Sequence, residues 1–238
     1  MKNLIEMEEI EQIAISVLAI SFAFTVVFSS IGGLIRYPGE FFVFMIMSLV
    51  TIGSGFILHE MSHKLVAMYY GAYARFRMWT RGILFMLFVS LFGVLFAAPG
   101  AVYIYSSNIT RRENGIISIA GPVINLLLAL FFVLLHLIYP IRIYFTFLQE
   151  GGIFGTSGGV VSVWLFGALI NIILGIFNMI PAFPLDGSKV YMWSKTAWFA
   201  MTFGMLGIGY AMGLGLGFIV AWIFLLLLAL FFSKMFFG

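Results

Sequence analysis

Apolar residues run almost without interruption along this chain, and short polar stretches divide them into blocks. A transmembrane helix needs about 20 consecutive apolar residues, and most of the blocks reach that length. The last block is long enough for one long span or two short ones. The pattern therefore predicts an α-helical polytopic membrane protein with about six transmembrane helices. The blocks cover residues 13–35, 41–71, 82–98, 114–140, 160–180 and 196–234.

The region after the second block departs from this helical pattern. Residues 82–98 are apolar but would span only about 25 Å as a helix. They are followed by the stretch PGAVYIYSS, residues 99–107, in which β-branched and aromatic side chains come after Pro-Gly. Such a stretch is typical of a short strand. We therefore expect a small membrane-associated β-hairpin or sheet after the second helix.

Composition supports the membrane assignment and narrows the classes of function. Of the 238 residues, 63% are hydrophobic and 9% are charged, whereas soluble domains carry about 25% charged residues. The net charge of +3 does not suggest a nucleic-acid partner, and the lack of cysteine excludes thiolate chemistry. The acidic start does not resemble a cleavable signal peptide. With no repeats and no linker, residues 1–238 are expected to form a single membrane-embedded domain.

The stretch HEMSH, residues 59–63, places three ionisable groups inside the second apolar block. His59 and His63 are four residues apart, so both imidazoles lie on one face of a helix and can reach one metal ion. In the pattern H-E-x-x-H the histidines bind zinc and the glutamate, here Glu60, acts as general base. Charged groups are costly inside a membrane and usually mark a functional site. The motif therefore predicts a zinc site.

Catalytic zinc usually takes a third protein ligand, and few candidates follow the motif. Glu113 and Glu150 lie in polar or Gly-rich stretches and are expected to be solvated loop charges. His136 precedes a helix end and is expected to be structural. Asp186, the sole aspartate, lies in FNMIPAFPLDG, where two prolines interrupt a hydrophobic span. Broken backbone at membrane depth is tolerated where it lines a cavity, so Asp186 is the predicted third ligand.

Three motifs together resemble the site-2 protease family of intramembrane zinc metalloproteases. They are HEMSH at 59–63, AGPVIN at 120–125, which resembles the family's G-P-x-x-N, and N-x-x-P-x-x-x-L-D-G at 178–187. The resemblance covers about residues 50–190 in order and spacing. It implies a Zn²⁺ cofactor bound by His59, His63 and Asp186, with Glu60 as the catalytic base. It also implies substrate-binding or oxyanion roles for Asn125 and Asn178.

The chain departs from the family pattern at two places. After the aspartate the family often has Gly-Gly or Gly-Arg, whereas this chain has Gly187-Ser188-Lys189. In addition, residues 82–98 look like an apolar insert. No PDZ or CBS extension is recognisable, so the chain resembles a minimal core. Any substrate selection by soluble domains would then come from another chain.

A shared metal constrains the topology. His59, His63 and Asp186 lie late in their spans, so they meet at one depth only if the two helices run in the same direction. Residues 72–113 must then begin and end on the same face, and 82–98 must be re-entrant or pair with 99–110. Arg36 and Arg142 fall on one side, and eight basic residues fall on the other. By the positive-inside rule, we expect a multi-pass cell-membrane protein whose N-terminus and active-site side are cytoplasmic. The eight residues are Lys64, Arg75, Arg77, Arg81, Arg111, Arg112, Lys189 and Lys195.

The expected reaction is hydrolysis of a peptide bond in or near a transmembrane segment of a substrate protein, as in regulated intramembrane proteolysis. Zinc-bound water activated by Glu60 is the expected nucleophile. A helical substrate must unwind to react, and a free strand edge can replace its hydrogen bonds. GAVYIY, residues 100–105, is the candidate edge. The expected partners are a transmembrane protein substrate and the lipid bilayer, with no nucleic acid and no soluble cofactor.

Two other functions are compatible with part of this pattern. A prenyl-protein-type membrane metalloprotease also uses H-E-x-x-H, but its third ligand is a glutamate in an E-x-x-x-D-type motif that this chain lacks. A zinc transporter, or a non-catalytic zinc-binding membrane protein, is the alternative outside the enzymes. A transporter normally needs a trail of ligands across the membrane. A non-catalytic relative would usually have lost Glu60, which is present.

Overall fold

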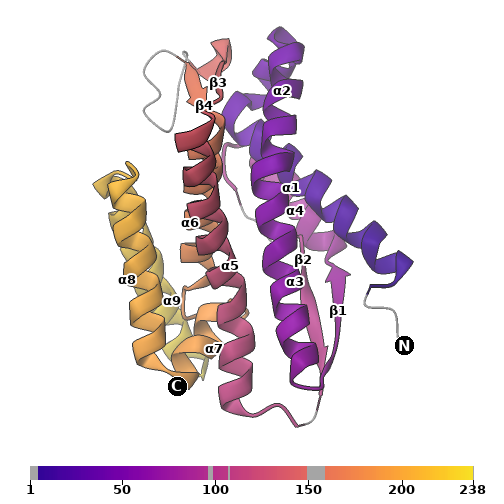
Figure 1. The fold of residues 1–238 in the computed structure, drawn as a ribbon, viewed down its shortest axis with the longest axis vertical. Coiled ribbons are helices and arrows are strands. Elements are labelled where there is room, and N and C mark those ends of the chain that lie inside the picture. Colours follow the sequence, from indigo (N-terminus) through magenta and orange to yellow (C-terminus); the bar gives the residue numbers. More distant parts are fainter. Residues whose placement is uncertain (1–4, 96–98, 107, 149–158, 238) are drawn as a thin grey trace.

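The computed structural model describes residues 5–95, 99–106, 108–148 and 159–237, and it is mostly helical with two small sheets (Figure 1). The predicted Gly-rich loop at 149–159 falls almost wholly outside these residues, as does Glu150. The helices are α1 (Met7–Arg36), α2 (Pro38–Ser48), α3 (Ser54–Tyr69), α4 (Thr80–Ser90), α5 (Arg111–Ile138), α6 (Val163–Asn178), α7 (Asp186–Trp193), α8 (Lys195–Ala211) and α9 (Leu216–Phe237). The π-helix η1 (Leu49–Gly53) and the 3₁₀-helix η2 (Thr146–Leu148) complete the helical elements, and the strands are β1 (Tyr73–Met78), β2 (Gly100–Tyr105), β3 (Arg142–Tyr144) and β4 (Val160–Ser162).

Three helical segments in the described part of the chain are long and apolar enough to cross a membrane. They are α1, the continuous run Pro38–Tyr69 and α5. Shorter apolar helices cover Thr80–Ser90, Val163–Asn178 and Leu216–Leu228. The predicted helical membrane fold is thus confirmed in outline, while the number of six crossings stays a prediction.

The second span is one continuous helix in which η1 separates α2 from α3. Pro38 occupies its first turn, where the missing amide donor costs nothing because no intrahelical partner exists there. The helix ends at Tyr69, and Gly71 turns the chain with a φ of 79°. Such a positive φ is accessible to glycine without a steric penalty. His59 and His63 therefore lie near the end of this long helix.

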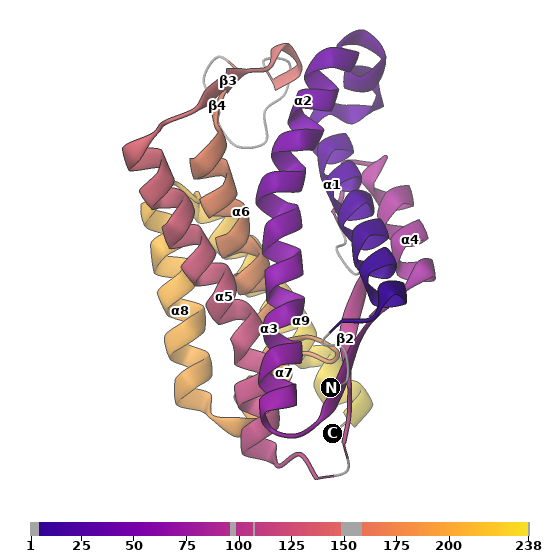
Figure 2. The same ribbon diagram turned by 45° about the vertical axis from the view of Figure 1, so that its right-hand side comes forward.

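The predicted sheet after the second span is present and consists of β1 and β2. The strands are antiparallel, with Tyr73 opposite Tyr105 and Met78 opposite Gly100. Between them α4 packs against α1, and Gly93 turns the chain with a φ of 74°. The described part of the predicted insert, residues 82–95, thus comprises most of α4 and the turn at Gly93, while its re-entrant course in the membrane stays a prediction. The chain leaves and returns at one end of the molecule before α5 begins (Figure 2).

The start of α1 is tied to the sheet and to α3 by polar contacts. Glu9 is buried and forms an ion pair with Lys64, the residue after His63, at 2.5 Å. Its carboxylate also accepts the backbone N–H of Phe76 at 2.9 Å. Gln12 accepts the N–H of Met78, also at 2.9 Å. Side chains of α1 therefore occupy the outward-facing amides of Phe76 and Met78 in β1.

Helices α3 and α6 run in the same direction, with α5 antiparallel beside both (Figures 1 and 2).

Glu113, predicted as a loop carboxylate, instead completes a capping box at the start of α5. Its side chain accepts the N–H of Thr110, and the Thr110 hydroxyl accepts the N–H of Glu113. This cap begins the helix at Arg111, three residues before the predicted start. Asp186 follows α6 after an irregular turn and begins α7.

The opposite end of the molecule carries a second small sheet that the pattern did not predict. Strands β3 and β4 pair antiparallel there, and the Nδ1 atom of His136 lies 3.0 Å from the hydroxyl of Ser162. This histidine is thus part of the contact between α5 and the second sheet. The last apolar block divides into the two helices α8 and α9 at Gly213, whose φ is 101°, while the number of spans in this block stays a prediction.

Candidate metal centre

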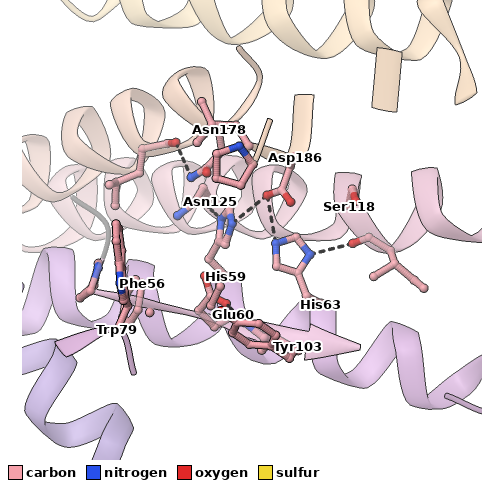
Figure 3. A pocket seen from close by; sticks show the side chains of 18 of the residues that line it. Phe56, His59, Glu60, His63, Trp79, Tyr103, Ser118, Asn125, Asn178 and Asp186 are labelled. Atoms are coloured by element: carbon pink, nitrogen blue, oxygen red, sulfur yellow. Dashed lines mark hydrogen bonds and ion pairs between the residues drawn. The ribbon is translucent and has the colours of Figure 1, made fainter. Parts of the chain in front are cut away.

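Two helices bring three metal-binding side chains to one point. His59 and His63 lie on consecutive turns of α3, and Asp186 is the first residue of α7. The Oδ2 atom of Asp186 lies 3.2 Å from Nε2 of His59 and 3.0 Å from Nε2 of His63 (Figure 3). All three side chains are buried. In the described residues, theirs is the one group of three or more histidine and acidic side chains with ligand atoms within 4.8 Å of one another.

The geometry and donor set of this group fit zinc. Ligand atoms about 2.0–2.1 Å from a tetrahedral zinc lie roughly 3.3 Å apart, close to the separations found here. Two imidazole nitrogens and one carboxylate oxygen leave a fourth position open, as catalytic zinc requires. Gly121 of the AGPVIN segment lies directly beside the two histidine side chains. A Cβ at that position would lie 2.5 Å from Nε2 of both histidines, so glycine keeps this space clear.

Hydrogen bonds on the far side of each imidazole set which nitrogen faces the centre. Nδ1 of His63 lies 2.7 Å from the carbonyl oxygen of Ile117. A carbonyl only accepts, so Nδ1 carries the proton and Nε2 presents its lone pair to a metal. Nδ1 of His59 lies 2.6 Å from Oδ1 of Asn125, which has the same consequence. Both histidines are held in the tautomer that binds metal through Nε2.

Glu60 is buried beside the two histidines and faces the sheet. Its Oε2 atom accepts the backbone N–H of Val102 in β2 at 2.8 Å. The carboxylate borders a cavity of about 280 Å³ whose walls come from α3, α5, α6, α7 and β2. Phe56, Trp79 and Tyr103 contribute aromatic surface to this cavity (Figure 3). The base predicted from the motif therefore lies where the metal ligands and an open strand meet.

The L-D-G turn explains how Asp186 is presented. A Cβ on Gly187 would lie 2.2 Å from the carbonyl oxygen of Met179, so glycine lets the start of α7 pack tightly against the preceding turn. The Ser188 hydroxyl donates to the carbonyl of Leu185 at 2.7 Å. Lys189 lines the cavity, with Nζ 3.8 Å from Oδ1 of Asp186. Of the two residues that depart from the family pattern, Ser188 thus bonds within the turn and Lys189 lies beside the carboxylate.

The two asparagines singled out from the motifs have different surroundings. Asn125 is fully buried, and its amide is engaged with His59 and with a second asparagine, Asn171. Asn178 borders the cavity, and its amide nitrogen donates to the carbonyl of Leu174 in its own helix at 3.0 Å. Their roles in holding substrate or an oxyanion stay predictions. Sequence reasoning missed Asn171, whose one signal is a polar residue inside an apolar helix.

Comparison with known proteins decides the family. The model for Peptidase family M50 matches residues 137–205. A protein of Methanocaldococcus jannaschii named "Putative zinc metalloprotease MJ0611" is 39% identical over 202 residues, which cover 84% of this chain and 91% of that protein. The chain belongs to peptidase family M50, the site-2 protease family of zinc metalloproteases. No solved structure matches it.

Membership in M50 fixes the class of chemistry. It supports a metalloprotease with zinc as its cofactor, and it selects the site-2 protease interpretation over the prenyl-protein-type one. The His59, His63 and Asp186 group supplies the place where this M50 protein can bind the ion.

Proposed function

We propose that this M50 protein is an intramembrane protease, which hydrolyses a peptide bond in or near a transmembrane segment of a substrate protein. The proposal is carried by the place of the H-E-x-x-H motif within Pro38–Tyr69, a helix long and apolar enough to cross a membrane. A metal centre on such a helix can reach peptide bonds that soluble proteases cannot. Regulated intramembrane proteolysis, with the bilayer and a membrane protein as partners, is the corresponding biological role.

The residues around the centre suit peptide hydrolysis. Zinc bound there would act as a Lewis acid that polarises the scissile carbonyl and makes water nucleophilic near neutral pH. Glu60 takes a proton from the attacking water, whose oxygen bonds to the carbonyl carbon. When the C–N bond breaks, Glu60 returns that proton to the leaving amine nitrogen. The N–H of Val102 orients the carboxylate for both transfers.

The free edge of β2 is the proposed docking place for an unwound substrate. In an antiparallel pair, outward-facing backbone groups occur on alternate residues. The bond from Val102 to Glu60 places Gly100, Val102 and Ile104 in the outward set of β2, and all three border the cavity. The outer edge of β1 is occupied by Glu9 and Gln12. Because the N–H of Val102 is bonded to Glu60, a substrate strand would pair with the remaining outward N–H and carbonyl groups of β2, on the side that faces the metal ligands.

The decisive experiment uses the purified full chain in vesicles with a single-span protein substrate. We expect zinc-dependent cleavage within the apolar segment, which a chelator abolishes and added zinc restores, with product masses locating the cut. Cleavage confined to extramembrane loops would contradict the intramembrane proposal. Zinc binding without cleavage of any single-span substrate would instead favour a non-catalytic zinc-binding protein.

A cysteine introduced at Arg112 tests the proposed cytoplasmic side with impermeant reagents, since the chain has no cysteine of its own.

Pairing with β2 predicts an alternating response to backbone methylation of a peptide substrate. In a paired substrate strand, the N–H groups of every second residue face β2, and those of the residues between them point away. N-methylation of the first set removes hydrogen bonds to β2, whereas N-methylation of the second set does not. Each lost hydrogen bond is worth about 1 kcal/mol. Two methyl groups of the facing parity, placed at least two residues from the scissile bond, should slow cleavage about tenfold or more. The opposite parity is the matched control, and equal effects of both parities would exclude strand pairing.

A further inference from the structure

Two buried asparagine amides connect the metal ligand His59 to α6 and to the π-helix η1. Oδ1 of Asn125 lies 2.6 Å from Nδ1 of His59. The amide nitrogen of Asn125 donates to Oδ1 of Asn171 at 3.0 Å. The amide nitrogen of Asn171 donates to the carbonyls of Thr51 in η1 and Gly167 in α6, at 3.2 and 2.8 Å. This chain of hydrogen bonds, from His59 through Asn125 and Asn171 to the carbonyls of Thr51 and Gly167, is called the relay below.

The carbonyls at the end of the relay fix the direction of every bond in it. The oxygens of Thr51 and Gly167 can only accept, so the NH₂ group of Asn171 must face them. Its Oδ1 is then left to accept from Asn125, whose own oxygen must turn toward His59. The imidazole is consequently the donor at Nδ1. The orientation of Asn171 therefore determines the tautomer of a residue that it does not touch.

The packing around Asn171 is built to hold this orientation. Asn171 and Asn125 are both 0% exposed, and a buried amide is costly unless its hydrogen bonds are made. A Cβ on Gly55 of α3 would lie 2.3 Å from Oδ1 of Asn171, and its three nearest heavy atoms all belong to that side chain. Gly55 therefore leaves the space in which the Asn171 amide sits.

We infer that Asn171 is a positioning residue for zinc, which acts through Asn125 to hold His59 in its metal-binding tautomer. Without Asn171, the Asn125 amide nitrogen keeps only its longer hydrogen bond to the carbonyl of Gly55, at 3.4 Å, and the amide can turn its NH₂ group toward His59. That arrangement favours a proton on Nε2, the nitrogen that must bind the metal. Supporting hydrogen bonds of this kind typically affect metal affinity 10- to 100-fold.

The first test is the zinc dissociation constant of Asn171→Leu in the full chain, measured by competition with a chromophoric chelator. We expect affinity to fall about tenfold or more. Thr25→Val is the matched control, because it removes buried hydrogen bonds to the carbonyl of Ser21 and the hydroxyl of Ser48, neither of which belongs to the relay, and should leave zinc affinity unchanged. A purely structural role for Asn171 would lower the melting temperature equally with and without zinc, at unchanged affinity. That result would overturn the inference.

Gly55→Ala gives an independent test that keeps Asn171 in the chain. The added methyl group displaces the amide, so zinc affinity should fall as it does for Asn171→Leu, even if the Leu variant does not fold. In an Asn171→Ala background the same methyl group should have little further effect on affinity, because the side chain it displaces is gone. Additive losses in the double variant, or wild-type zinc affinity in Gly55→Ala, would contradict the relay.

The inference rests on His59 binding the metal, and His59→Ala separates the two claims. If His59→Ala binds zinc like the wild type, the metal centre itself is wrong. If it loses zinc while both relay variants retain wild-type affinity, the centre stands and the role of Asn171 falls.

Discussion

Replacing Glu60 with glutamine is expected to lower kcat by about 10²- to 10⁴-fold while zinc remains bound. Glutamine keeps the size of the side chain and can still accept the N–H of Val102 through its oxygen, but it cannot take a proton from water. The histidine and aspartate ligands are unchanged. Cleavage of a single-span substrate and metal content, measured on the same preparation, test both halves of the prediction.

Glu40→Gln is the matched control for this variant. The Glu40 carboxylate accepts the backbone N–H and the hydroxyl of Thr146 near the second sheet, away from the metal centre. Its replacement should leave kcat unchanged. Normal cleavage by Glu60→Gln would show that another group is the base, and loss of zinc from that variant would show that Glu60 supports the metal centre instead.

Asp186→Ala is expected to abolish both zinc retention and proteolysis. This change removes one of three ligands, so affinity should fall by more than the roughly 10- to 100-fold typical of a supporting hydrogen bond. The two imidazoles that remain cannot complete the three-ligand set of a catalytic zinc site. Chelator competition and metal analysis of the purified full chain measure the loss directly.

Glu113→Ala provides the comparison for Asp186→Ala. Glu113 is the other described carboxylate after the motif, and it caps α5. Its loss should cost about 1 kcal/mol of folding free energy and leave zinc affinity as in the wild type. Zinc retention by Asp186→Ala at wild-type affinity would remove Asp186 from the ligand set.

The metal centre was predictable because its signals are local. The spacing of His59 and His63 fixes one helix face, and the prolines before Asp186 break a span at a recognisable place. The same holds for β2, whose β-branched and aromatic residues predict a strand. Thr110 and Glu113 form a recognisable capping-box pattern, so the start of α5 could also have been found.

Other features depend on partners that lie far away in the sequence. The charges of Arg75 and Arg77 argue against a membrane-associated strand when the sequence is read alone. In the folded chain both arginines form ion pairs with Glu8 of α1, so β1 can carry them. Asn171 carries no spacing signal, since its hydrogen-bond partners come from two other segments, α5 and η1, and from its own helix. Only the three-dimensional structure shows that both the oxygen and the nitrogen of this isolated side-chain amide have hydrogen-bond partners.

The attachment of α1 to β1 limits how the enzyme can open. Lifting the first two turns of α1 would separate Glu9 from Lys64 and leave the N–H groups of Phe76 and Met78 without acceptors. Phe76 is fully buried, and a buried donor that loses its acceptor costs about 1–3 kcal/mol. We therefore expect the first span and the β1–β2 hairpin to move together, so that opening of the cavity for substrate leaves the contact between them intact.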